Sequence, residues 1–256
     1  MKTDSHEQDN TTDWKLLFNL AGVAALLAVF VFRRNLGAEL IAFRGIGLSA
    51  VPAAMPGDAA GWFALLHQHP LIGLTLLEVF DLVEYALVGL IFLAISVALW
   101  KVNRSAIFVA ATLGWAGIIT YFASNQAFAL LSLSEQYASA TTEAQRGLLL
   151  AAGQALLAVY NPGVLHQGTG IYICMLLVPL AGLILSLVMF ESHIFNKATA
   201  VTGLLANGFI LCYFPVIAFA PGWLIWPYVF SAPLRVVWYF LIALKLFHLG
   251  KDTKPT

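Results

Sequence analysis

The chain has 256 residues, of which 61% are hydrophobic and only 10% are charged, and its formal net charge is zero. Soluble domains average roughly 25% charged residues, so this composition excludes an ordinary soluble domain and predicts a polytopic membrane protein. The balanced charge and the lack of basic clusters argue against nucleic acid as a partner, and the lipid bilayer is the expected one. Cys174 and Cys212 form no C-x-x-C motif and are expected to be buried as small hydrophobic residues.

The apolar runs predict six membrane spans in an all-α transmembrane helical bundle. An acidic tail at 1–13 precedes the first run, which is followed by Arg33 and Arg34 instead of a cleavage site and is therefore expected to be a retained span. Continuous apolar runs of this length are typical of helices and not of barrel strands. The expected spans are 14–32, 71–100, 105–130, 170–190, 198–219 and 223–248. They form a single transmembrane domain at 14–248, followed by a polar tail at 249–256.

The two longer outer loops are expected to carry short interfacial helices. In the first, Pro56-Gly57-Asp58 reads as a turn with Asp58 as the N-cap. Apolar residues then follow at helical spacing and could lie on the membrane surface, namely Trp62, Leu65, Leu66 and His69. In the second loop, Thr142 and Gln145 match a capping box at the start of an apolar element too short to cross.

The placement of lysine and arginine predicts the orientation of the bundle. With six spans both termini lie on one side, which carries eight basic residues against four on the other. This excess favours cytoplasmic termini, although the first span taken alone favours the opposite direction. The eight are Lys2, Lys15, Lys101, Arg104, Lys197, Lys245, Lys251 and Lys254, and the four are Arg33, Arg34, Arg44 and Arg146.

Three carboxylates lie in the first half of the expected second span. At helical spacing Glu78, Asp81 and Glu84 share one sector roughly 120° wide. An ionised side chain in hydrocarbon costs several kcal/mol, so these acids should face other helices or a polar cavity. Arg235, well inside the sixth span, is expected to pair with Glu84 or Asp81. The surplus acid would then be protonated or neutralised by a cation, unless the pair only pins two helices together.

Other polar residues are weaker candidates for a binding site. Asn125 near the outer end of the third span and Asn207 inside the fifth can each hydrogen-bond a neighbouring helix or a ligand. The histidines of the outer side, His67, His69 and His166, match no zinc spacing, so no metal site is expected. No nucleophile elbow, zinc-protease motif or phosphate-binding loop is present, so neither an enzyme nor a cofactor is indicated.

Several segments resemble a family of six-span bacterial membrane proteins, domain of unknown function 4386. The similarity extends over about 15–250 and implies a bacterial inner-membrane location, but it implies no activity, ligand or site residue. The similar segments are Pro56-Gly57-Asp58-Ala59-Ala60, the acid-bearing second span with its Lys101-Val102-Asn103-Arg104 end, His166-Gln167-Gly168-Thr169-Gly170, and the connection from Phe190 to Ala198.

The residues therefore favour binding or transport of a small solute or cation through a polar centre between the second and sixth spans. The alternatives are a structural or accessory protein that stabilises a partner complex, in which the polar groups serve only helix packing, and an intramembrane enzyme acting on lipid. Sequence alone does not separate the first two, and it leaves the oligomeric state open.

Overall fold

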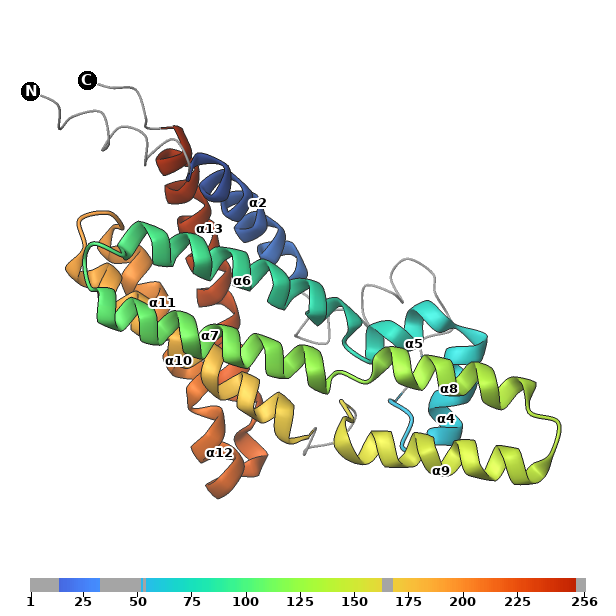
Figure 1. The fold of residues 1–256 in the computed structure, drawn as a ribbon. Helices are drawn as coiled ribbons and strands as arrows, with labels where there is room; N and C mark the ends of the chain where they lie inside the picture. The colour runs from blue at the N-terminus through green and yellow to red at the C-terminus, as the bar shows by residue number, and fades with distance from the viewer. Residues whose placement is uncertain (1–13, 33–51, 53, 163–167, 252–256) are drawn as a thin grey trace, which may run out of the picture. The chain divides into compact units, whose positions relative to one another are not determined.

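The structure, a computed structural model, describes residues 14–32, 52, 54–162 and 168–251, and every regular element in these ranges is a helix (Figure 1). Lys2, Arg33, Arg34, Arg44, His166 and Lys254, on which parts of the sequence analysis rest, lie outside the described residues. The helices are α2 (Lys15–Phe32), α4 (Ala59–Gln68), α5 (Pro70–Leu76), α6 (Val79–Leu99), α7 (Arg104–Ser124), α8 (Ala127–Ser139), α9 (Glu143–Val159), α10 (Thr169–Glu191), α11 (Lys197–Leu211), α12 (Tyr213–Phe219), the 3-10 helix η1 (Pro221–Trp223) and α13 (Ile225–Lys251).

Among the described residues, five helical stretches are long and apolar enough to cross a membrane. They are Val79–Leu99, Arg104–Ser139, Thr169–Glu191, Lys197–Phe219 and Pro221–Lys251, and a shorter apolar helix covers Lys15–Val29. The helical, multi-pass membrane architecture expected from the composition is therefore supported, with five candidate spans.

The expected second span is not one continuous helix. It is interrupted at Leu77 and Glu78, between α5 and α6, and Glu78 has a φ of +55°. Residues other than glycine rarely adopt this left-handed conformation, because the Cβ atom approaches the backbone. The prediction that Glu78 shares a helix face with Asp81 and Glu84 is consequently wrong, since only the latter two lie on α6.

Two other expected spans are also interrupted. α7 ends before Asn125, whose side-chain oxygen accepts a hydrogen bond from the Ala127 amide at 3.0 Å as α8 begins. The fifth span divides at Cys212 into α11 and α12. Cys212 is exposed there, which contradicts the expectation of burial, whereas Cys174 is buried as expected.

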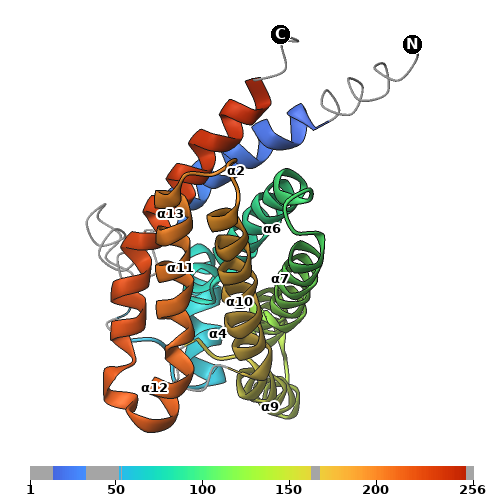
Figure 2. The ribbon, with the colours of Figure 1, turned by 90° about the vertical axis from the view of Figure 1, so that its left-hand side faces the viewer.

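The chain divides into two compact units, and the first comprises 1–36, 84–118 and 175–256. In unit 1, α13 packs against both α2 and α11 (Figure 2). The face of α2 toward the interior is made of small residues, with Ala21, Ala25 and Ala28 each 0% exposed. Small residues let helix backbones approach closely, which is how membrane helices associate without a hydrophobic driving force.

Unit 2 comprises 37–83 and 119–174 and contains α4, α5, α8 and α9. Asp58 caps α4 by accepting from the Gly61 amide at 2.8 Å, and Thr142 forms the expected capping box with Gln145, so both local predictions are confirmed. α4 packs against α8 and α9. Trp62 and Leu66 of its apolar stripe are buried, Leu65 is half-buried and His69 is exposed, so protein covers part of the stripe that could have lain on the membrane surface.

Candidate functional site

The break between α5 and α6 brings several polar groups of unit 2 together. α5 ends at Leu76, so the carbonyl of Leu77 lies past the last turn of a helix, where carbonyls lack intrahelical donors. The carboxyl group of Glu78 follows directly, and its side chain is half-buried. Because α5 ends and the 21-residue α6 begins at Val79, the carboxylate lies between the C-terminus of one helix and the N-terminus of another.

Tyr160 supplies the central side chain of this site. It is the C-cap of α9, where its own amide donates to the Leu156 carbonyl at 2.9 Å, and its side chain is 0% exposed. The Tyr160 hydroxyl donates to the Leu77 carbonyl at 2.9 Å and lies 3.2 Å from Oε2 of Glu78. We call Leu77, Glu78, Tyr121, Asn125 and Tyr160 the break cluster.

The connection after α7 completes the break cluster. Asn125 donates from Nδ2 to the Tyr160 hydroxyl at 3.1 Å, and it lies at 3.5 Å from the carbonyl oxygens of both Leu77 and Glu78. The Tyr121 hydroxyl is likewise 3.5 Å from the Glu78 carbonyl. The 3.5 Å contacts are at the limit of hydrogen bonding, so the main partner of the Asn125 Nδ2 group in this cluster is the Tyr160 hydroxyl.

Electrostatics keep the Tyr160 hydroxyl protonated. Burial raises its pKa well above the ordinary value for tyrosine, and the charge of the Glu78 carboxylate raises the pKa further. Asp81 acts in the same direction more weakly, whereas a hydrogen bond from Tyr121 lowers the pKa of Tyr160. The hydroxyl is therefore a permanent donor with one proton at any physiological pH.

That single proton faces two acceptors. The Leu77 carbonyl at 2.9 Å can only accept, and an ionised Glu78 carboxylate at 3.2 Å can also only accept. One O–H group cannot donate fully to both acceptors at once. A proton on Glu78 would add a second donor at this point, and a cation beside its carboxylate would contact the same oxygen atoms.

The oxygen atoms of the break cluster suit a small hard cation or a proton. Carbonyl, carboxylate and hydroxyl oxygens are the ligands that such ions prefer. In the described ranges no three His, Cys, Asp or Glu side chains gather in an arrangement that could hold a metal. The break cluster thus contains one carboxyl group, that of Glu78, together with carbonyl, hydroxyl and amide groups.

The remaining predicted site residues lie elsewhere. Glu84 and Arg235 are in unit 1, where both act electrostatically on the buried hydroxyl of Tyr239, one turn after Arg235 on α13. Asp81 is in unit 2 and half-buried. A direct contact of Arg235 with Glu84 or Asp81 stays a prediction.

Asn207 belongs to the helix packing of unit 1. It is 4% exposed, and its Nδ2 donates to the Gly203 carbonyl of its own helix at 2.8 Å. Its side chain also lies against Gly182 of α10, where an added Cβ would be 2.5 Å from Oδ1 of Asn207. The structure therefore brings Glu78 and Asn125 together, while Asn207 lies in the other unit.

No family model, curated protein or solved structure matches the chain. Membership of domain of unknown function 4386 accordingly stays a prediction, and the function rests on the residues themselves.

Sequence reasoning missed Tyr121, Tyr160 and the break itself. Tyr160 lies 82 residues from Glu78 along the chain, and no local pattern marks the two as partners. The one available signal was an acid in a long apolar run, a position that an unbroken membrane helix could hold only at high cost.

Proposed function

We propose that the protein binds a small cation and transports it across the membrane. The break cluster is the binding site. The ion is a proton on Glu78 or a monovalent cation beside its carboxylate. The observation that carries this proposal is the Tyr160 hydroxyl, whose one proton lies between the Leu77 carbonyl and the Glu78 carboxyl.

The location of the break cluster supports the same function. Transporters commonly bind coupling ions where a membrane helix is interrupted, because the released carbonyls and the helix C-terminus act as ligands. Irregular backbone at membrane depth is tolerated only where protein or a water-filled cavity surrounds it. The interruption after α5 places the Leu77 carbonyl and the ionisable side chain of Glu78 directly before the candidate span Val79–Leu99.

We further propose six spans with both termini in the cytoplasm. α2 has 18 residues, which at 1.5 Å per residue gives about 27 Å, close to the thickness of the hydrocarbon core. It packs along α13, which is a candidate span, so α2 could cross the membrane beside α13. The excess of lysine and arginine on the side of the termini sets the direction.

Cysteine labelling tests this topology. In a background without Cys174 and Cys212, Gly147→Cys should react with a membrane-impermeant maleimide added outside intact cells, because Gly147 is exposed on α9. An added Cβ at Gly147 meets no atom within 4 Å, so the substitution should not disturb the fold. Lys101→Cys, on the exposed turn after α6, should react only after the cells are lysed. The reverse pattern would overturn the orientation.

If the break cluster binds an ion, the free energy of unfolding should depend on pH and on the concentration of cations. If the folded protein holds a proton on Glu78 that the unfolded chain releases above about pH 4.3, stability falls as pH rises, by up to about 1.4 kcal/mol per pH unit. The stabilisation that this proton provides is then complete below about pH 4.3, where the folded and the unfolded chain both hold it. Excess sodium or potassium should restore it at high pH if the site also accepts these ions. The measurement is thermal unfolding of the purified protein across pH and salt.

Two variants distinguish the titration of Glu78 from the titration of other carboxyl groups. Glu78→Gln should lose the part of the pH dependence that comes from Glu78, because the amide N–H replaces the acid proton without titrating. Glu135→Gln removes an exposed carboxylate from α8 in the same unit and should keep the wild-type profile. Indistinguishable profiles for all three proteins would reject ion binding and favour a purely structural cluster. Asp81→Asn and Glu84→Gln extend the comparison to the other two acids.

A further inference from the structure

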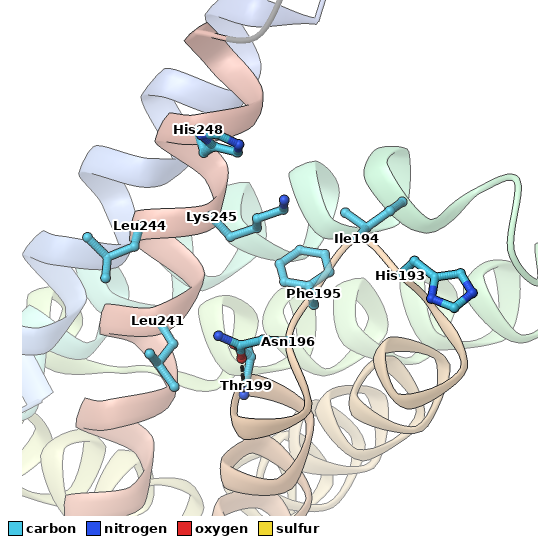
Figure 3. A pocket seen from close by; sticks show the side chains of 9 residues that line it. All are labelled: His193, Ile194, Phe195, Asn196, Thr199, Leu241, Leu244, Lys245 and His248. Carbon is cyan, nitrogen blue, oxygen red and sulfur yellow. Dashed lines mark hydrogen bonds between the residues drawn. The ribbon is translucent and has the colours of Figure 1, made fainter.

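An open groove of about 460 Å³ lies in unit 1, between the α10–α11 connection and the C-terminal part of α13 (Figure 3). This volume falls in the range of roughly 300–1,000 Å³ typical of small-molecule sites. The groove is separate from the break cluster, because all of its lining residues belong to unit 1. The proposed ion binding makes no use of it.

The groove is lined by basic side chains and by no acid. Lys245, His248 and His193 are among its nine lining residues, and none of the nine carries a carboxylate. Lys245 and His248 extend from α13 toward the connection (Figure 3). Lys245 is half-buried and forms no ion pair with any residue that the structure describes. Its charge is therefore available for an anion.

The start of α11 adds to this positive potential. Asn196 lines the groove and caps α11, accepting from the Thr199 amide at 2.7 Å. That bond satisfies one of the first amides of the helix, and the others at a helix N-terminus have no intrahelical acceptor. A 15-residue helix also directs its positive dipole end to this point, where an anion is favoured.

The groove is also half apolar and lies at an expected boundary of the membrane. α10 and α11 both belong to candidate spans, so the short connection between them, 192–196, is expected to lie where the two spans leave the membrane. Leu241 and Leu244 of α13 line the same groove, and Leu244 is 53% exposed. A ligand with an anionic end and an apolar end matches this division better than a soluble anion does.

We propose that this groove binds the phosphate headgroup of an anionic phospholipid. Lys245 contacts the phosphate, the N-terminus of α11 and His248 complete its surroundings, and the acyl chains run along Leu241 and Leu244. Basic pockets between membrane helices on the cytoplasmic side recognise such headgroups, and the predicted orientation places this groove there.

Native mass spectrometry of the full-length protein in detergent tests the proposal. The probes are phosphatidylglycerol, phosphatidylcholine and inorganic phosphate. We expect one tightly bound phosphatidylglycerol, with phosphatidylcholine and inorganic phosphate each at least about tenfold weaker. Lys245→Gln should weaken phosphatidylglycerol binding about tenfold, the loss expected for one charge-assisted hydrogen bond. Lys245→Arg should retain most of the binding because it keeps the charge.

Lys101→Gln is the matched control, because it removes one positive charge from the same predicted side of the membrane but outside the groove. It should bind phosphatidylglycerol as the wild type does. An equal loss in Lys101→Gln and Lys245→Gln would overturn the proposal in favour of unspecific attraction. Displacement of the lipid by inorganic phosphate would overturn it in favour of a soluble phosphate compound. If Lys245→Gln does not fold, His248→Gln takes its place and should weaken binding several-fold.

Discussion

Gly203→Ala should destabilise the protein by about 1–3 kcal/mol, the usual cost of overpacking a closely packed interior. Gly203 lies on α11 where α10 and α13 approach it. A Cβ added there would overlap the Ser186 hydroxyl and the indole nitrogen of Trp238. Trp238 is 1% exposed and Ser186 is 0% exposed, so neither side chain has free space to move into. The Ser186 hydroxyl is also held by its 2.7 Å bond to the Gly182 carbonyl.

The same substitution at Gly208 on the same helix provides the control. An added Cβ at Gly208 meets no atom within 4 Å, and alanine favours a helix over glycine by up to about 1 kcal/mol. Gly208→Ala should therefore leave stability unchanged or raise it. Unfolding in detergent, followed by helical circular dichroism, measures both variants. Equal stabilities for Gly203→Ala and Gly208→Ala would contradict the close approach of α10, α11 and α13.

Tyr160→Phe should destabilise the protein by about 1–3 kcal/mol, although it removes only one oxygen atom. That oxygen donates to the Leu77 carbonyl at 2.9 Å and accepts from Nδ2 of Asn125 at 3.1 Å. Phenylalanine keeps the packing of the ring but leaves a carbonyl and an amide without their shared partner in the interior.

Tyr137→Phe distinguishes this effect from a general loss of tyrosine hydroxyls in unit 2. Tyr137 lies on α8 with its ring 5.5 Å from that of Phe63, and phenylalanine preserves this contact. A change within about 0.5 kcal/mol is expected, as for substitutions away from buried polar groups. The same thermal melts compare both variants, and a Tyr160→Phe protein as stable as Tyr137→Phe would show that the Tyr160 hydroxyl does not hold the break together.

The two proposed binding sites, the break cluster and the groove lined by Lys245, can be tested independently of each other. The break cluster lies in unit 2 and concerns the proton balance of Glu78, whereas the groove lies in unit 1 and concerns the charge of Lys245. Lys245→Gln should consequently leave the pH profile of stability unchanged, and Glu78→Gln should leave phosphatidylglycerol binding unchanged. Each proposal can thus fail while the other stands.

The sequence by itself determined those features that depend on composition and on neighbours within a few residues. The apolar runs identified a helical membrane protein, because only long apolar helices satisfy their backbone groups in lipid. The caps at Asp58 and Thr142 were predicted correctly, because the side chain and the amide that it caps are three residues apart. The same reasoning identified Glu78 and Asn125 as candidate site residues.

Only the tertiary structure decided how these candidates are arranged. The helix is interrupted at Glu78, where the bonds from Tyr160 and Asn125 reach the chain from positions 82 and 47 residues away. Helix periodicity assumes an unbroken helix, so it placed Glu78 on the wrong face. In the same way, the sequence allowed the stripe containing Trp62 to lie on the membrane surface, because a hydrophobic pattern does not show whether lipid or another helix covers it. In the structure, Trp62 and Leu66 of this stripe are buried inside unit 2.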